Sequence, residues 1–247
     1  MRRVIRRALP PPTQGALDRR QQKADQKRTA AGTLNVQSTW NSARKTKPLA
    51  TVFKTLKEMA GERERCMYCG DSHGTDIEHF WPKTPYPERM FRWPNMLLCC
   101  TECGRFKGER FPLDANGLPL LVDPSAANPW DFLDFNPDTY NFVARFDLAT
   151  NAPSAHGATT VDLLQLDRRE ALEAGYRKTH KRILALAERA AHQDTVDIDD
   201  LLAQLSESDD HGLLGWYFSG TGRNLKPFST LRARHPAAWA ACVTAFT

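Results

Sequence analysis

The stretch CMYCGDSHGTDIEHFWPKTPYPERMFRWPNMLLCCTECGRFKGERFP, residues 66–112, decides how the fold of this chain is interpreted. It holds five of the six cysteines, including two Cys-x-x-Cys pairs, Cys66 with Cys69 and Cys100 with Cys103. Each pair lets two thiolates approach one ion, and two pairs complete a tetrahedral site of four sulfurs. Zn²⁺ is the expected metal because it favours thiolates and has no redox chemistry. The sequence therefore predicts a closed, structural zinc site that fastens the two ends of a loop.

Two cysteines lie outside these pairs. Cys99 is adjacent to Cys100, so we expect its side chain to point away from the ion and to be a small buried apolar residue. Cys242 lies in an Ala-rich apolar stretch and is interpreted in the same way. A thioredoxin-like redox role is disfavoured because neither pair follows a strand and opens a helix in a βαβ unit.

The loop between the pairs contains Asp76, Glu78 and His79 within four residues. In an extended chain Asp76 and Glu78 share one face. A carboxylate beside a histidine suits metal-assisted phosphodiester hydrolysis, in which the carboxylate holds a hard ion and neutral imidazole takes a proton from water. An isolated Glu-His pair is more often an ordinary surface pair, so these residues alone do not decide the function.

In this context the segment resembles the HNH endonuclease family. The matching motifs are Cys66-x-x-Cys69, Glu78-His79-x-x-Pro82, Asn95, Cys100-x-x-Cys103 and Lys107-Gly108. The resemblance implies an α+β protein with a zinc-stabilised, treble-clef-like ββα-metal core embedded in a mostly helical chain. Two strands would carry the acid-His pair and the Asn, and a helix would carry the last catalytic position.

The resemblance also implies roles for single residues. His79 would be the general base, Glu78 a ligand of a catalytic Mg²⁺ or Mn²⁺ with Asp76 as a further candidate ligand, and Asn95 the residue that holds the catalytic loop. Three basic residues are candidates for binding nucleic-acid phosphates: Lys83, Arg105 and Lys107.

One position departs from the usual HNH pattern. The residue directly after the last cysteine, usually His or Asn, is Gly104, which has no side chain to bind metal. Asp76, Glu102 or Asp114 could take this place, or water could fill it. This departure affects which groups would bind the catalytic metal ion more than it affects the expected class of reaction.

A second resemblance covers roughly residues 1–135. The segments that carry it are MRRVIR, GTDIEHFWPKTPYPE, LLCCTECGRFKGERFP and LPLLVDPSAANPWDFLDF. They are similar to the PtuB-like HNH nuclease component of Septu and retron-associated anti-phage defence systems, in which Gly after the last cysteine is normal. This resemblance implies a partner ATPase of the ABC/OLD-like class (PtuA-like) and invading DNA as the target. The resemblance to the retron-associated systems adds a retron reverse transcriptase and the DNA of that enzyme as candidate partners. The alternative, from another class, is a zinc-stabilised module that binds nucleic acid or protein without cutting.

Charge and composition divide the chain into three expected regions. Residues 1–60 form a basic arm with helices, and residues 1–65 carry 16 Lys and Arg against 5 Asp and Glu. Residues 61–150 form the nuclease core and a covering loop. Residues 151–247 form a helical region that docks a partner or, alternatively, completes the core. Residues 194–211 of this region hold 7 acidic and no basic side chains.

The periodicity of apolar residues predicts individual elements. Helices are expected over 16–32, 48–61, 159–193 with a break near Asp167, 197–207 and 235–246, and a strand over 140–147. The helix over 16–32 has almost no apolar stripe and is expected to be an exposed helix or a disordered arm. Trp130, Phe132 and Phe135 are interpreted as core residues rather than base-stacking residues.

No stretch approaches the roughly 18 apolar residues of a membrane span. The basic N-terminus lacks the apolar run and cleavage site of a secretory signal. We therefore expect a soluble, cytoplasmic protein that has no membrane partner and whose cysteines stay reduced.

Overall fold

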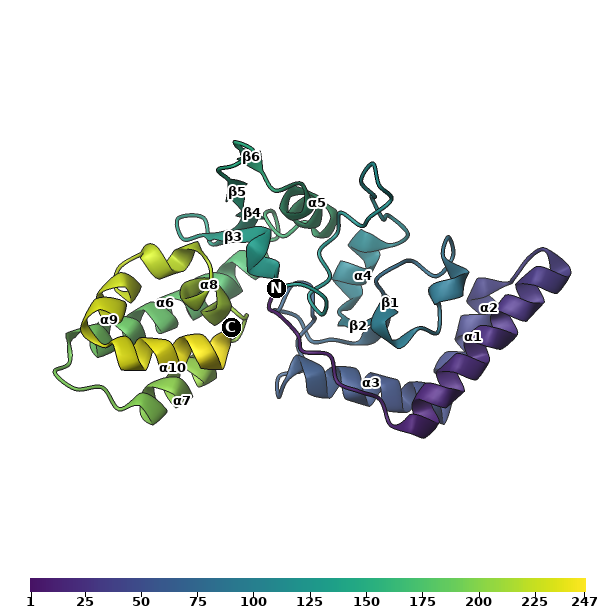
Figure 1. Ribbon diagram of the computed structural model, residues 1–247, viewed down its shortest axis with the longest axis horizontal. Coiled ribbons are helices and arrows are strands. Elements are labelled where there is room, and N and C mark those ends of the chain that lie inside the picture. The colour runs from purple at the N-terminus through teal and green to yellow at the C-terminus, as the bar shows by residue number, and fades with distance from the viewer. The chain divides into compact units, whose positions relative to one another are not determined.

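A computed structural model describes residues 1–247 and divides the chain into two compact units. The N-terminal unit comprises Val4–Met67 and Ser72–Leu113, and the C-terminal unit comprises Met1–Arg3, Tyr68–Asp71 and Asp114–Thr247. Helices dominate, and the strands form three separate two-stranded antiparallel sheets (Figure 1). This mixture of helices and small sheets agrees with the α+β class expected from the sequence. None of the helices combines the length and apolar composition that crossing a bilayer requires.

The N-terminal unit contains four α-helices and one sheet. Its elements are α1 (Pro11–Ala31), α2 (Val36–Arg44), α3 (Lys47–Ala60), β1 (Asp76–His79), β2 (Met96–Cys99) and α4 (Thr101–Lys107), with 3₁₀ turns η1 (Pro87–Arg89) and η2 (Trp93–Asn95).

Helix α1 is held in place by a polar side chain. It starts at Pro11, because proline is tolerated in a first helical turn, and ends at Gly32, whose φ of 68° only glycine adopts readily. Its narrow buried face includes Gln21, whose amide donates to the Pro87 carbonyl (3.0 Å) and accepts from the Phe91 N–H (2.8 Å). The segment is therefore an ordered helix and not a disordered arm.

Helix α3 behaves as its apolar periodicity predicts. Leu49, Val52, Leu56 and Met59 are buried on one face, and the helix ends before Gly61. This face packs against β2, so α3 supports the strand that leads directly into the second cysteine pair.

Strands β1 and β2 form an antiparallel hairpin that continues directly into α4 (Figure 1). Glu78 lies opposite Leu97 and His79 lies opposite Met96. All four residues of β2 are buried, which fixes its register because a one-residue slip would turn the wrong face inward. Cys100 then caps α4, since its sulfur accepts the backbone N–H of Cys103 (3.4 Å).

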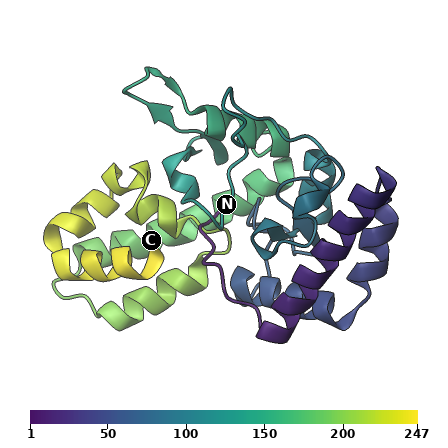
Figure 2. The ribbon, with the colours of Figure 1, turned by 45° about the vertical axis from the view of Figure 1, so that its right-hand side comes forward.

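The C-terminal unit combines short strands with a helical bundle. Its elements are η3 (Pro129–Asp131), β3 (Leu133–Asn136), β4 (Asn141–Ala144), β5 (Phe146–Asp147), β6 (Ala152–Pro153), α5 (Ala155–Leu164), α6 (Glu170–His192), α7 (Ile198–Ser208), α8 (Leu214–Phe218), η4 (Thr221–Asn224), α9 (Phe228–Arg234) and α10 (Pro236–Phe246). Helices α7 and α9 pack on α6, and α10 packs across α7, α8 and α9 (Figure 2). The break expected near Asp167 lies between α5 and α6.

The prediction of one continuous strand over 140–147 is wrong. Phe142 pairs with Phe135 in the β3–β4 hairpin and is fully buried, whereas Phe146 belongs to β5 and is half exposed. The chain is redirected at Arg145, whose backbone N–H donates to the Phe132 carbonyl and whose guanidinium donates to the Trp130 carbonyl. The alternation of apolar residues at every second position could not reveal this change of partner strand.

Aromatic side chains form the core of the C-terminal unit. Trp130 and Phe135 are buried, as predicted, and both lie against Phe142, which in turn contacts Tyr176 of α6. Phe132 is only partly buried, so the prediction of a core position holds for two of the three residues.

Candidate metal centre and catalytic site

The two cysteine pairs converge as the sequence predicts. The ligand atoms of Cys66, Cys69, Cys100 and Cys103 all lie within 4.8 Å of one another, and all four residues are buried and free of disulfides. A tetrahedral zinc with bonds of about 2.3 Å needs sulfurs about 3.8 Å apart, so the residues present fit a structural ion. Four buried thiols without an ion would have no comparable reason to cluster. The group can hold one metal ion.

The first pair is anchored to the sheet by backbone hydrogen bonds. Met67 N–H donates to the Leu98 carbonyl (2.9 Å) and Cys66 N–H to the Ser72 carbonyl (2.8 Å). Gly70, with a φ of 70°, lets the chain turn sharply after Cys69. Met67, beside Cys66, is thus bonded to β2, the strand that leads into the second cysteine pair.

Cys99 and Cys242 are buried and lie outside this group, as expected, but the Cys99 side chain hydrogen-bonds with Cys66 and Cys100 and so does not point away from the group. The Cys99 thiol donates to the Cys100 carbonyl (3.2 Å), and hydrogen bonds with Cys100 and Cys66 raise the pKa of Cys99. Burial raises the pKa of Cys242 to about 11. Both are therefore protonated thiols at neutral pH.

His79 lies at the end of β1 in a closed environment. It is 3% exposed, and the Trp40 ring approaches it edge-on at 4.4 Å. Its Nε2 lies 2.9 Å from the Met90 carbonyl, which can only accept, so Nε2 carries the proton and Nδ1 keeps its lone pair. The pKa of His79 is lowered to about 3, first by burial and then by the charge of Lys83. The imidazole is therefore neutral at physiological pH.

Glu78 is paired with a buried lysine. The Lys107 ammonium donates to Glu78 Oε1 and to the His79 carbonyl, both at 2.8 Å, and its side chain has no exposed surface. Burial raises the pKa of Glu78, and the charge of Lys107 opposes that shift. Lys107, predicted to bind phosphate, is thus occupied within the site and presents no ammonium to solvent.

Asp76 lies at the exposed start of β1. Its Oδ1 pairs with Arg44 of α2 at 3.1 Å and accepts the N–H of Ile77 at 2.9 Å. The four cysteines are the only group of three or more potential metal ligands that the structure brings together. Asp76, Glu78 and His79 therefore do not form a second cluster of convergent ligands.

Asn95 bridges the two ends of the loop that follows His79. Its Oδ1 accepts the Trp81 N–H (2.7 Å), and its Nδ2 donates to the carbonyls of Trp81 and Arg89 (both 3.0 Å). Its own carbonyl accepts the Phe80 N–H (2.8 Å). Every polar group of this buried amide is used to fix the path of the chain beyond the histidine.

Gly104 lies on the side of α4 that faces Glu78. A Cβ placed on Gly104 would lie 3.7 Å from Glu78 Oε2 and 3.8 Å from Cys99 Sγ, which is ordinary contact. Of the suggested substitutes, Glu102 is exposed on α4, and Asp114 is engaged in its own turn, accepting the N–H groups of Asn116 and Leu118. Room for a methyl-sized group therefore exists between Gly104 and Glu78 Oε2, and neither Glu102 nor Asp114 is shown to occupy it.

The other two predicted phosphate-binding residues remain accessible. Lys83 is partly exposed and close enough to His79 to lower its pKa. Arg105 is exposed on α4, with its guanidinium 5.5 Å from the Phe106 ring. The sequence missed the internal role of Lys107 and the contact of Trp40 with His79, because both join positions far apart in the chain.

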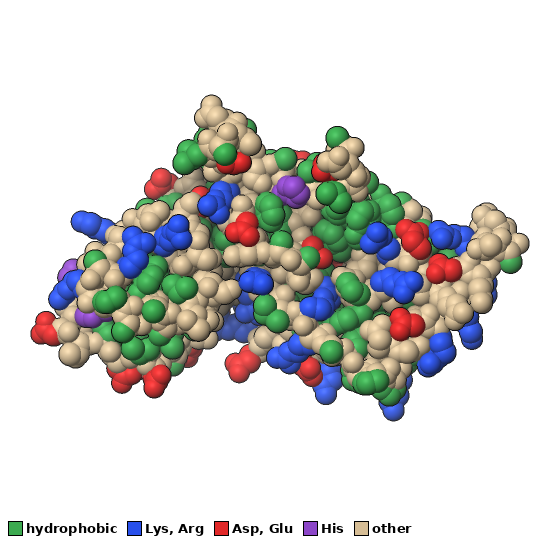
Figure 3. Space-filling model, in the orientation of Figure 1, with side chains coloured by type: hydrophobic (Ala, Val, Ile, Leu, Met, Phe, Trp, Pro, Cys, Tyr) green, Lys and Arg blue, Asp and Glu red, His purple; other side chains and the backbone are tan.

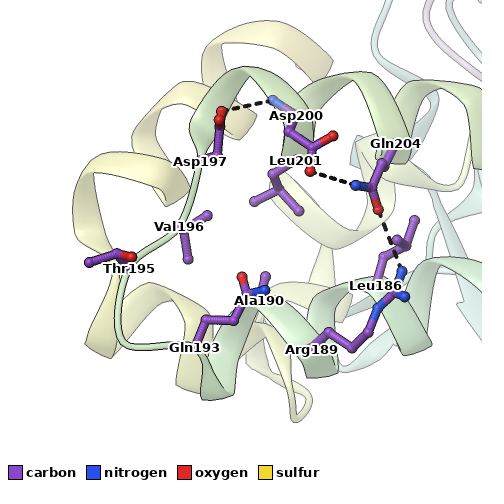
Figure 4. Close-up of a pocket in the computed structure, with 10 residues that line it drawn as sticks. All are labelled: Leu186, Arg189, Ala190, Gln193, Thr195, Val196, Asp197, Asp200, Leu201 and Gln204. Carbon is purple, nitrogen blue, oxygen red and sulfur yellow. Dashed lines mark hydrogen bonds between the residues drawn. The ribbon is translucent and has the colours of Figure 1, made fainter.

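Two further groups of polar side chains lie in the C-terminal unit. Thr179, His211 and Asp71 are linked by hydrogen bonds of 2.7 and 2.9 Å, but Thr179 is fully buried, so no substrate can reach its hydroxyl. A hollow of about 340 Å³ lies between α6 and α7 (Figure 4). Its polar groups bond to one another, Asp200 to Gln204 and Gln204 to Arg189, and it contains no predicted catalytic residue.

Comparison with known proteins supports one of the sequence resemblances. No family model matches the chain. A stretch of 122 residues is 29% identical to the Septu protein PtuB of Bacillus thuringiensis. This chain is similar to PtuB. The match covers 47% of the chain and 41% of PtuB, so less than half of that protein's length is spanned. The predicted PtuB-like resemblance is thereby confirmed.

Proposed function

We propose that the chain is a metal-dependent HNH-type endonuclease that hydrolyses DNA phosphodiester bonds. The observation that carries the proposal is the joint placement of Glu78, His79 and Gly104 on β1 and α4, directly beside four clustered cysteines. A strand pair followed by a helix, with the acid-His pair on the first strand, is the arrangement that the ββα-metal resemblance implies.

His79 has the tautomer that a general base needs. With Nε2–H donated to the Met90 carbonyl, Nδ1 can accept a proton from water. A pKa of about 3 makes this imidazole a weak base, and catalysis is efficient when the pKa of the base lies near the working pH. The proposal therefore requires an attacking water that is more acidic than bulk water.

A hydrated Mg²⁺ or Mn²⁺, when bound, would supply that acidity and stabilise charge on the phosphate. Glu78 would be its protein ligand, because Mg²⁺ retains several waters and takes only one or two carboxylates. Asp76 would be a further ligand only after leaving its ion pair with Arg44. Lys107 opposes the rise in the pKa of Glu78 that burial causes, and so favours the ionised form that a metal ligand must have.

The similarity to PtuB supports a role as the effector of a Septu-type anti-phage system. In this proposal a PtuA-like ATPase of the ABC/OLD-like class controls the nuclease. The three-region division proposed from the sequence assigns ATPase docking to residues 151–247, and the acidic residues of α7 would meet a basic face of that partner. A retron reverse transcriptase is a further candidate partner.

The decisive experiment measures cleavage of plasmid DNA by the zinc-loaded full chain, with and without its ATPase, in Mg²⁺ or Mn²⁺. We expect metal-dependent cleavage that His79→Ala abolishes. His73→Ala is the matched control, because His73 is exposed and its side chain pairs with Glu64 at 3.5 Å. Equal cleavage by His79→Ala and the parent would refute the assignment.

The burial of His79 favours a second candidate function, a zinc-stabilised module that binds nucleic acid or the ATPase without cutting. A 3% exposed imidazole and a Glu78 already neutralised by Lys107 are compatible with a purely structural pair. DNA binding without cleavage under every metal and partner condition would support this alternative.

A further inference from the structure

Four aromatic rings cluster in the N-terminal unit directly after the catalytic histidine. Trp81 contacts Tyr86 (4.8 Å between ring centroids) and Phe111 (4.7 Å), and Phe111 also meets Phe80 (5.2 Å). Phe80 is buried, but Trp81, Tyr86 and Phe111 each keep part of their surface exposed. The cluster is therefore a core on one side and a surface on the other.

Cationic side chains border this aromatic surface. The Arg89 guanidinium lies 4.2 Å from the centre of the Trp81 ring, and Arg89 is exposed. Lys83 lies two residues after Trp81 and lowers the pKa of His79, so its charge is felt at the catalytic residue. Figure 3 shows Lys and Arg mixed with Asp and Glu over the face in view.

The position of this pair is set by the catalytic loop. The Asn95 side chain bonds the backbone of Trp81 on both its N–H and its carbonyl and bonds the carbonyl of Arg89. Trp81 is two residues from His79, so the ring and the imidazole are placed by the same short segment. A rigid aromatic ring held in this way loses little conformational entropy when it binds a flat ligand.

We propose that Trp81 and Arg89 form a stacking platform for an unpaired nucleobase beside the scissile phosphate. The inference rests on the proposed nuclease function and narrows its substrate class to single-stranded or locally unpaired nucleic acid. In a duplex the faces of the bases are covered by their neighbours, so an aromatic ring or a guanidinium plane can stack only on a base that is unpaired. Lys83, two residues after Trp81 and partly exposed, would contact the adjoining phosphate.

The test measures binding of labelled oligonucleotides to the zinc-loaded full chain carrying His79→Ala, without Mg²⁺ or Mn²⁺. Fluorescence anisotropy compares a single-stranded 12-mer, the same strand with abasic spacers, and its duplex. We expect the single strand to bind about 10-fold or more tightly than the abasic strand, which matches the loss of one stacked base. The same measurements with DNA and with RNA oligonucleotides show whether the chain prefers deoxyribose or ribose.

Substitutions then assign the preference to the platform. Trp81→Leu keeps the side chain apolar but removes the π face and should abolish the difference between normal and abasic strands, whereas Trp81→Phe should retain most of it. Trp239→Leu is the matched control, because Trp239 of α10 forms a similar pair with Arg232 of α9 (5.7 Å) in the C-terminal unit. Zinc content and thermal melting establish that each variant is folded.

The outcomes separate the platform from the proposed function. Equal affinity for normal and abasic strands, tighter binding of the duplex, or an unchanged preference in folded Trp81→Leu overturns the platform. A base-dependent preference in a protein that never cleaves would leave the platform standing and remove the nuclease proposal. Cleavage without any base-dependent preference in binding would support the nuclease proposal and remove the platform.

Discussion

Single residues set the charge balance of the candidate site, and Lys107 is the clearest case. Its ammonium is completely buried and bonds both Glu78 and the backbone of His79. Removing one member of a buried ion pair leaves the other charge uncompensated, whereas removing both costs much less. Lys107 therefore acts as a positioning residue for the acid-His pair.

Lys107→Met is expected to lower the free energy of unfolding by about 3 kcal/mol. The double variant Lys107→Met with Glu78→Gln should recover much of this loss, because no unpaired charge remains. Urea denaturation of the zinc-loaded protein measures both values. Lys54→Met is the control, since Lys54 is exposed on α3 and should change stability by less than about 0.5 kcal/mol. A double variant as unstable as the single one would contradict the pairing.

The burial of His79 predicts how stability depends on pH. The pKa of His79 falls from 6.5 to about 3 on folding, so the unfolded chain binds more protons between these values. This contribution to stability is complete above pH 6.5 and is lost as the pH falls, by about 2 kcal/mol at pH 5. His79→Gln should show a shallower loss between pH 7 and 5 in urea denaturation. Identical slopes in the two proteins would show that His79 is not buried in its neutral form.

At the scale of elements, apolar patterns determine which helices form, and polar side chains help to determine where the helices dock. Helix α3 could be predicted from its apolar stripe, and the metal-binding turns from cysteine spacing, because both signals are local. Helix α1 could be predicted to form but not to dock, since Gln21 reaches partners 66 and 70 residues away. The pairing of Glu78 with Lys107, 29 residues apart, was hidden for the same reason.

Gln21→Leu tests this anchoring of α1. The substitution removes the acceptor of the buried Phe91 N–H, and an unsatisfied buried donor costs about 1–3 kcal/mol. Chemical denaturation should show this loss, together with faster hydrogen exchange in the Pro87–Phe91 segment. Gln22→Leu is the matched control, because Gln22 is the exposed neighbour on the same helix. Equal stability of the two variants would argue against a docked α1.

For the whole molecule, the four-cysteine group links metal content to folding. The ion would close a loop of about thirty residues that contains every predicted catalytic residue, so binding of the metal contributes folding free energy to the site. The candidate site thus depends on the joining of distant cysteines by one ion, which their spacing in the sequence predicts. It also depends on side-chain packing, which the spacing does not predict.

We expect one zinc per chain in elemental analysis, and loss of that zinc in Cys103→Ser. Cys99→Ser should retain it, because Cys99 is buried beside the group but is not a member of it. Chelation should lower the melting temperature and reduce helical circular dichroism as α4 loses its Cys100 cap. A chain that contains no metal and melts at the same temperature with or without chelator would exclude a structural ion.

The burial of Lys107 also makes this side chain an internal reporter. An amine-reactive reagent will modify the exposed lysines of the native protein and spare Lys107, because its side chain offers no surface to the reagent. Any event that draws Glu78 away from it, such as arrival of a divalent cation or engagement of a regulatory ATPase, would release the amine for labelling. Mass spectrometry of that one position could therefore follow opening of the site in real time, whether or not a bond is ever cut.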